Sequence, residues 1–470
     1  MLLLAVAVFV GSQPCRSCHA AIAEVYARTP MARSSGPVKS VPPAEFIASG
    51  QHYRVAGGRL AFDQGSAPFD YFIGSGSHGQ SYLFAREGYL FELPVTWYAR
   101  TAAWDASPGY EHYREPRLDR AVDTTCLWCH ASQVRFVRGT QNRYADPPFA
   151  DNGIGCERCH GPGSEHVRDP AAARMVNPAK LDPERRDSVC AQCHLSGVSR
   201  VTRAGRTFEN FRAGDRLADY ATYFVREGGT PNLRVTSHVE RLAASGCKLA
   251  AEDALWCGTC HDPHTGANRT QAACLSCHAQ AHHIEQNCAG CHMPKLAAAD
   301  AGHGVFTDHS IPREAARVRA KDAPGRPIAF LGTVDDRALG IAYAEAGDSR
   351  ALEFLLKAQP VDSEVRLRLA AVEPDPTRAA ALYAAVLKSD PANPTALVNL
   401  GALYGAAGRA SDAAALWKRA LETNPALEGA ALNLSRVLPR PEARAVLERY
   451  LSFNPGSRAV RERLEALSPP

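Results

Sequence analysis

The first regular pattern along the chain is an alternation of apolar and polar side chains in its N-terminal third. Residues 51–62 read QHYRV and RLAF on either side of Gly57 and Gly58, and residues 80–93 repeat this pattern around a second glycine turn. Successive side chains of a strand point to opposite faces, and glycine favours tight hairpin turns. The sequence therefore predicts two hairpins within a small antiparallel β insert at about residues 41–120.

The last third of the chain has a helical period instead. Residues 394–427 contain two apolar, alanine-rich blocks joined by GAAGRAS. Their register matches the tetratricopeptide pattern of a 34-residue helix–turn–helix unit at Leu397, Leu400, Gly401, Tyr404, Ala413, Trp417, Ala420 and Pro425. Weaker copies flank it at residues 338–360, 365–391 and 430–455. We predict an α-α tetratricopeptide solenoid, the alternative being an unrelated alanine-rich helical bundle.

Between these regions the pattern is dominated by seven copies of C-x-x-C-H. The cysteines are Cys15, Cys18, Cys126, Cys129, Cys156, Cys159, Cys190, Cys193, Cys257, Cys260, Cys274, Cys277, Cys288 and Cys291. The histidines that follow them are His19, His130, His160, His194, His261, His278 and His292. This motif attaches c-type haem: two thiols one turn apart bond to the vinyl groups, and the histidine ligates the iron from the proximal side. We predict seven covalent haems, the first on a helix in residues 13–40.

The distribution of cysteine and histidine divides the chain. Its 470 residues are enough for two or three domains. No cysteine follows Cys291 and no histidine follows His309, so the C-terminal third carries none of the metal chemistry. Residues 15–309 supply only about 42 residues per motif, too few for an ordinary apolar core around each haem. The haem faces are therefore expected to form much of the interior.

Net charge adds little to this interpretation. The formal charge is +4, but two propionates on each haem would make the holoprotein acidic. The sequence has no long basic run, so no nucleic-acid partner is predicted.

The distal ligands of the irons are sought among ten further histidines, all of which lie in the haem region. Their local context favours distal ligation by His166, His238, His264 and His309, with hydrogen bonding or a surface position as the alternative. His78, His282 and His303 are further candidates. For the remaining histidines the alternative is hydrogen bonding to propionates: His52, His112 and His283.

Two sulfur-containing residues complete the candidate set. Met31 follows the Thr29-Pro30 break, twelve residues after His19, and a thioether ligand would raise the potential of its haem. The alternative is a packing methionine. Cys247, outside every motif, is expected to be a buried thiol.

The first residues, MLLLAVAVFV, are apolar but too short to span a bilayer. We expect residues 1–12 to include the remnant of a secretion signal, although a plain N-terminal strand or a wrongly assigned start would also fit. The haem motifs predict export, because c-type haem is attached outside the bacterial cytoplasmic membrane. Periplasmic or other extracytoplasmic localisation is the prediction, with no transmembrane anchor evident.

Several of these segments together resemble multihaem c-type cytochromes. They are FVGSQPCRSCH, YARTPMARS, CHGPGSEHV, CHDPH and CHMPK…FTDHSIPR. The chain is similar to the superfamily of tetrahaem cytochromes c and hydroxylamine oxidoreductase, in a branch fused to tetratricopeptide repeats. The resemblance implies electron transfer through paired haems. It also implies that Met31 is a ligand, since a histidine serves at that point in the tetrahaem relatives.

The expected fold is mainly α: a haem-packed cytochrome domain with the β insert, followed by the solenoid. We place the cytochrome at 13–312, a linker at 313–332 and the repeats at 333–470. The first functional hypothesis is an electron carrier with redox partner proteins, whose repeats dock a protein partner. The alternative is an oxidoreductase that acts on a small nitrogen or sulfur species at one open haem. No catalytic residue is marked in the sequence, and a solenoid that only caps the haem domain is a further alternative.

Overall fold

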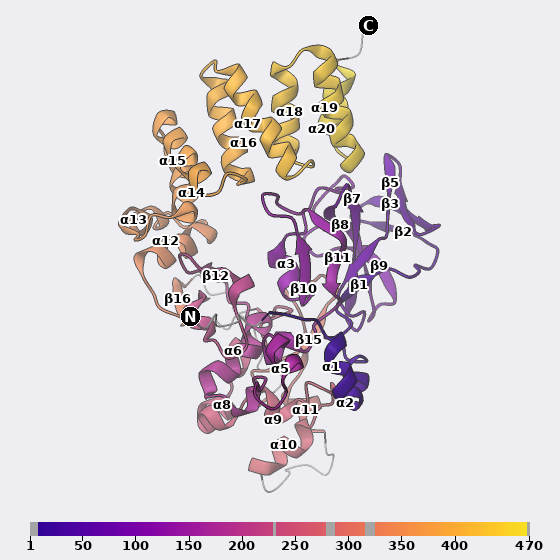
Figure 1. Cartoon of the computed structure of the whole chain (residues 1–470), viewed down its shortest axis with the longest axis vertical. Coiled ribbons are helices and arrows are strands. Elements are labelled where there is room, and N and C mark those ends of the chain that lie inside the picture. The colour runs from indigo at the N-terminus through magenta and orange to yellow at the C-terminus, as the bar shows by residue number, and fades with distance from the viewer. Residues whose placement is uncertain (1–7, 229–231, 279–286, 315–324, 468–470) are drawn as a thin grey trace.

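Helices and sheets segregate along the chain in the computed structural model, which describes residues 8–228, 232–278, 287–314 and 325–467. Figure 1 places the C-terminal helices at the top, a β region at the right and the short helices of the C-x-x-C-H region below. The N-terminal helices lie beside that lower region. Most C-x-x-C-H motifs therefore lie in the lower part of the molecule, while the second motif, on the helix labelled α3 (Thr124–Trp128), lies higher, beside the β region.

The β region consists of two antiparallel sheets with strand orders β1-β6-β7-β8-β9 and β2-β3-β4-β5. The strands are β1 (Ser35–Pro37), β2 (Ala44–Ala48), β3 (Gln51–Ala56), β4 (Arg59–Phe62), β5 (Gly65–Pro68), β6 (Tyr71–Ile73), β7 (Gly79–Arg86), β8 (Tyr89–Tyr98) and β9 (Ala103–Ala106). Both predicted hairpins are confirmed, as β3–β4 and β7–β8. Aromatic and aliphatic side chains such as Tyr53, Phe84 and Leu93 form the shared core.

The motif region is built from short helices. They are α1 (Gln13–Cys18), α2 (Ala20–Tyr26), α3 (Thr124–Trp128), α4 (Glu157–His160), α5 (Ser164–Arg168), α6 (Pro183–His194), α7 (His238–Ala243), α8 (Gly246–Ala251), α9 (Cys257–Cys260), α10 (Thr270–Cys277) and α11 (Cys288–His292). The single helix expected in residues 13–40 is wrong, because His19 leaves the helical conformation between α1 and α2. The second helix ends at Tyr26, just before Thr29-Pro30, where proline disfavours a helical residue ahead of it.

Three small sheets connect these helices. They are β10 (Gln133–Phe136) with β11 (Tyr144–Asp151), β12 (Ser199–Thr202) with β13 (Ala221–Arg226) and β16 (Pro327–Leu331), and β14 (Lys295–Ala297) with β15 (Val305–Thr307). The described residues thus form sixteen strands in five sheets. The expectation of a mainly α fold with one small β insert underestimates the β structure.

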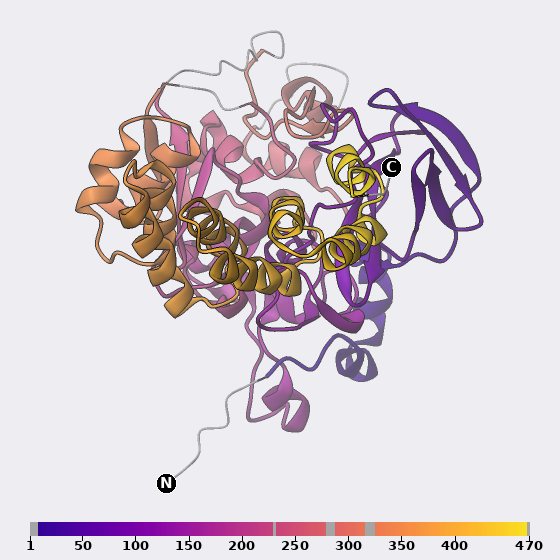
Figure 2. The ribbon, with the colours of Figure 1, turned by 90° about the horizontal axis from the view of Figure 1, so that it is seen from above.

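The C-terminal third is an arc of antiparallel helices, seen from above in Figure 2. They are α12 (Asp336–Glu345), α13 (Ala351–Lys357), α14 (Ser363–Val372), α15 (Pro376–Ser389), α16 (Pro394–Ala406), α17 (Ala410–Thr423), α18 (Glu428–Val437), α19 (Arg440–Phe453) and α20 (Arg458–Glu465). Helices α16 and α17 form the predicted unit. A Cβ on Gly401 would lie 2.6 Å from the Trp417 indole nitrogen, so glycine permits this close helix approach.

The two ends of the arc contact different parts of the remaining chain. At the first end, Arg337 of α12 donates a 2.8 Å hydrogen bond to the Thr202 carbonyl of β12. At the other, Phe453 is buried in the β-region core beside Tyr89 and Phe91. The helices are therefore packed onto the body at both ends. None of the helices in the described residues is long and apolar enough to cross a membrane.

Candidate metal centres

The seven C-x-x-C-H motifs lie on or directly beside short helical segments, and all fifteen cysteines of the chain are free of disulfides. Because the two cysteines of a motif are three residues apart, a single helical turn places their thiols on the same side of the helix. In the longest of these helices, α6, Asp182 caps the N-terminus by accepting from the Arg185 amide, and Pro183 occupies the first turn. The motif then ends the helix, which brings Cys190, Cys193 and His194 to its C-terminal turn.

Thiols of different motifs come close together in pairs. In four pairs the neighbouring thiol raises the pKa of the first-named cysteine: Cys15 beside Cys156, Cys193 beside Cys129, Cys190 beside Cys257, and Cys274 beside Cys288. Cys274 also lies near Cys260, and Arg158 lies near Cys129, Cys159 and Cys193. Numbered along the chain, each motif has thiols near those of another motif. Motif 1 lies beside motif 3, motif 3 beside motif 4, motif 4 beside motif 5, motif 5 beside motif 6 and motif 6 beside motif 7. Motif 2 lies beside motif 4.

Predicted distal histidines lie opposite motif histidines from distant parts of the chain. The ring centres are 6.4 Å apart for His19 and His166, 5.9 Å for His160 and His264, and 6.1 Å for His261 and His309. Two imidazoles that bind one iron from opposite sides, through bonds of about 2 Å each, have ring centres about 6 Å apart. All three spacings fit an iron held between the rings.

A fourth predicted ligand, His238, joins a tighter group. Its ring centre is 5.2 Å from that of His194 and 4.7 Å from that of His309, with the planes nearly perpendicular. The buried Nδ1 of His238 has no hydrogen-bond partner among the described residues. A buried polar atom without a partner is costly, so the His238 ring fits a site that a bound metal would complete.

Backbone carbonyls orient several of these rings. The Nδ1 atom of His160 lies 2.7 Å from the Val176 carbonyl oxygen, and that of His166 lies 2.7 Å from the Ala173 carbonyl oxygen. The Nδ1 atom of His309 lies 3.0 Å from the Thr307 carbonyl oxygen. A similar 3.1 Å contact joins His292 to Pro312. When Nδ1 donates to a carbonyl, Nε2 keeps its lone pair and can bind a metal.

The protonation of the central histidines also suits metal ligation. Burial, followed by the imidazoles of His309 and His261, lowers the pKa of His194 to about 4. Burial and the neighbouring imidazoles lower the pKa of His238 to about 3. The pKa values of His160 and His309 are also lowered, chiefly by burial. These rings are neutral near pH 7, the form that coordinates iron.

Further polar atoms that have no hydrogen-bond partner within the described part of the chain lie beside Cys129 and Cys193. They are Trp128 Nε1, Arg158 Nε and Tyr223 Oη, all buried. The Arg158 guanidinium lies 3.8 Å above the centre of the Trp128 ring. A cofactor with acidic groups would supply partners for such donors, so this part of the chain also fits haem.

The other predicted ligands lie elsewhere. His78 packs on Phe306, with ring centres 4.4 Å apart, and burial lowers its pKa. His303 Nε2 is 2.6 Å from Asp105 Oδ2, which gives it a partner other than iron and leaves it the least supported candidate. Met31 is half-buried, and its carbonyl accepts from the Ile154 amide. His282 lies outside the described residues. Cys247 is half-buried near Cys260 and Cys274.

Acidic residues that the sequence reasoning missed support the motif segments. Glu157 is 3% exposed and accepts from the backbone amides of Val10, Gly11 and Gly163. Glu240 accepts from the amides of residues 196 and 197, two and three positions after His194. The only available sequence signal was the position of both glutamates within three residues of a motif cysteine or predicted ligand.

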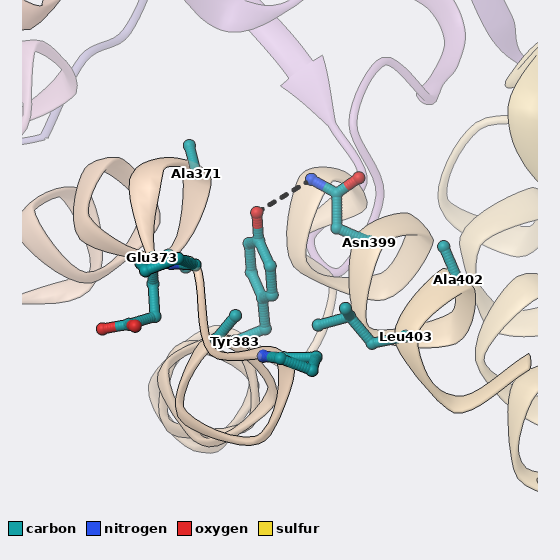
Figure 3. Close-up of a pocket in the computed structure, with 10 residues that line it drawn as sticks. Ala371, Glu373, Tyr383, Asn399, Ala402 and Leu403 are labelled. Atoms are coloured by element: carbon teal, nitrogen blue, oxygen red, sulfur yellow. Dashed lines mark hydrogen bonds between the residues drawn. The ribbon is translucent and has the colours of Figure 1, made fainter. Parts of the chain in front are cut away.

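The helical arc contains a groove between α14, α15 and α16, drawn in Figure 3. Its volume is about 510 Å³, and Ala371, Ala402 and Leu403 are among its apolar lining residues. Inside it, Asn399 Nδ2 donates a 3.2 Å hydrogen bond to the Tyr383 hydroxyl. A second cavity, of about 380 Å³, lies where α17–α19 meet Tyr89 and Arg143.

Comparison with known proteins adds the following similarities. The model of the family "Cytochrome c554 and c-prime" matches residues 98–161. The multiheme cytochrome MtrA of Shewanella baltica (strain OS185) is 24% identical over 214 residues, 39% of this chain and 62% of the relative. The match thus spans less than two thirds of that relative's length.

Two solved structures are also similar in part. The outer cell wall cytochrome OcwA is 15% identical, with a TM-score of 0.43 over 91% of this chain and 99% of that one. Pseudomonas aeruginosa pilF is 24% identical, with a TM-score of 0.25 over 28% of this chain and 65% of its own.

Proposed function

We propose that this chain, a multihaem c-type cytochrome with tetratricopeptide-type helices, carries electrons through seven covalently bound haems. Haem iron supplies one-electron exchange between the ferric and ferrous states. The observation that carries the proposal is the pairing of His166, His264 and His309 with motif histidines at about 6 Å. Irons closed on both sides by imidazole exchange electrons without binding substrate.

The chain's own residues would divide the work between attachment and ligation. The motif cysteines hold the haems, and the motif histidines supply the proximal ligands. His166, His238, His264 and His309 would supply distal ligands, with His78, His282, His303 and Met31 as further candidates. The close approach of thiols from successive motifs supports a continuous route from the first motif to the seventh.

The groove of the helical arc supports a second part of the proposal, which is docking of a protein partner. It combines an apolar floor with a hydroxyl and an amide from Tyr383 and Asn399, a mixture that suits an extended peptide. Replacement of Ala402 by arginine should weaken partner binding while the haem content stays unchanged. Export to the periplasm or another extracytoplasmic compartment follows from haem attachment.

Two measurements test the electron-carrier proposal. Intact mass spectrometry should give the mass of the chain plus seven haems. Electron paramagnetic resonance of the oxidised protein should give low-spin signals, and the reduced protein should not bind carbon monoxide or nitric oxide. Fewer haems would refute the count, and a strong high-spin signal that responds to gas would refute a pure carrier.

One observation favours the alternative function, an oxidoreductase for a small nitrogen or sulfur species. The buried His130 has no histidine ring in contact with it among the residues that the structure describes. The Ser34 hydroxyl bonds to the carbonyls of both Met31 and His130, so an iron bound there would keep an open face for a small molecule only if Met31 packs instead of ligating it. Gas binding that disappears when Cys126→Ser and Cys129→Ser together remove this haem would support this alternative, and gas binding that persists in that variant would exclude the haem at His130 as its site.

A further inference from the structure

A buried ion pair joins the two segments that carry His238 and His309. Arg241 lies on α7, three residues after His238, and Asp308 directly precedes His309. Arg241 Nε donates to Asp308 Oδ1 at 2.8 Å, and the guanidinium Nη2 donates to Oδ2 at 2.5 Å. The side chains are 1% and 0% exposed, so the pair is fully removed from solvent.

The Asp308 carboxylate has additional donors. The Ser310 amide donates to Oδ1 at 2.9 Å and the Ser310 hydroxyl donates to Oδ2 at 2.7 Å. Each carboxylate oxygen thus accepts two hydrogen bonds. The adjacent His309 is oriented separately, through Nδ1 and the Thr307 carbonyl.

Helix α7 depends on such contacts for its position. It has six residues, too few to be stable as an isolated helix. Glu240 binds it to the loop after His194, and Arg241 binds it to the His309 segment. One short helix therefore connects the surroundings of three histidines, two of which have ring centres only 4.7 Å apart.

Stability alone is a weak reason for this pair. A buried ion pair is often no more stabilising than apolar residues of the same volume, whereas removal of one partner leaves an uncompensated charge. Here that charge would lie close to two predicted iron ligands. Local charge and hydrogen bonding are among the main determinants of haem potential.

We propose that Arg241 and Asp308 are positioning residues that hold His238 and His309 in one arrangement and cancel each other's charge beside their two irons. This inference rests on the proposed function, because it requires both histidines to be distal ligands. The reduction potentials of two neighbouring haems would then depend on this single pair of side chains.

The test is a redox titration of the full-length holoprotein, followed by visible and electron paramagnetic resonance spectroscopy. Arg241→Gln leaves the carboxylate alone, which favours ferric iron, so two haems should shift to lower potential. Asp308→Asn leaves the guanidinium alone, so the same two haems should shift to higher potential. The double variant should lie between them. His238→Ala and His309→Ala identify the signals that belong to these haems.

A matched control is the pair of Arg337 and Asp362, whose arginine is 7% exposed and lies on α12. Arg337→Gln should leave all potentials unchanged. If Arg241→Gln does not yield holoprotein, Arg241→Lys keeps the charge but loses the two-point hydrogen bond. It should then change the line shape of the two low-spin signals more than their potentials.

The opposite signs separate this inference from a purely structural role. Shifts in one direction for both variants, no shift in either, or equal shifts in the Arg337→Gln control would overturn it. If His238→Ala and His309→Ala leave every low-spin signal intact, the ligand assignment fails and this inference fails with it. If they remove signals while the Arg241 and Asp308 variants change none, this inference alone fails.

Discussion

The packing of Phe453, at the end of α19, leads to a prediction about stability. Its side chain is 0% exposed, and its ring centre lies 6.2 Å from that of Tyr89 and 6.0 Å from that of Phe91. Truncation of a buried phenylalanine to alanine removes transfer free energy and leaves a cavity, together about 3–5 kcal/mol. Phe453→Ala should therefore lower the free energy of unfolding by that amount.

The effect should extend across the contact between the helical arc and the β region. Hydrogen exchange followed by mass spectrometry should show faster exchange in α19 and also in β8, which carries Tyr89 and Phe91. Urea unfolding followed by circular dichroism gives the magnitude. The control is Leu356→Ala on α13, where the side chain is 70% exposed and the expected change is within about 0.5 kcal/mol.

Two results would refute this reasoning. One is a Phe453→Ala variant within about 1 kcal/mol of the parent protein, which would mean that the site collapses without a cavity. The other is faster exchange confined to α19, which would mean that the β region and the last helices do not share a core.

Three further predictions concern helix packing, pH and the N-terminus. Gly401→Ala places a Cβ 2.6 Å from Trp417 and should destabilise the protein by about 1–3 kcal/mol in urea unfolding, whereas Gly429→Ala, with its nearest neighbouring atom at 3.8 Å, should be neutral or stabilising. The hydrogen bond from Arg449 of α19 lowers the pKa of Glu87. The contribution of this bond to the free energy of unfolding is therefore present above the ordinary glutamate pKa and lost as pH falls through the lowered pKa. Glu87→Gln should thus destabilise by at most about 0.5 kcal/mol at neutral pH, and the difference should shrink below about pH 4. The backbone amides of Val10 and Gly11 donate to the buried Glu157, so N-terminal sequencing of the mature protein should find both residues retained; a start after Ser12 would contradict this.

Local patterns predicted the local structure well. The hairpins at Gly57-Gly58 and Glu87-Gly88 and the α16–α17 unit depend on turns and periodicities that lie within one short stretch of sequence. The first helix was predicted too long because the motif histidine itself, His19, breaks it. Pairing between distant segments had no local signal, as in β13 and β16, where Tyr223 pairs with Leu331.

The candidate site divides in the same way. The residue types and spacing identified the motif cysteines and histidines, and local context selected the four histidines that lie beside motif histidines. Which ring faces which was not predictable, since His19 and His166 come from segments far apart in the chain. The partnership of Arg241 with Asp308 has the same origin, because burial and tertiary contact create it.

The shared core around Phe453 has a consequence for how this chain can be recombined. All cysteines and histidines precede the predicted linker at residues 313–332, so this linker resembles a boundary between two modules. However, the Tyr89 hydroxyl bonds to the Glu422 carbonyl, and the Leu118 amide donates to Asn454. A chimera cut at that linker would expose the β-region core, whereas exchange of the α14–α15 helix pair alone would preserve both that core and the α16–α17 unit. The middle of the arc, where the groove lies, can thus be exchanged between related chains. The last helices of the arc must be kept together with the β region that shares their core.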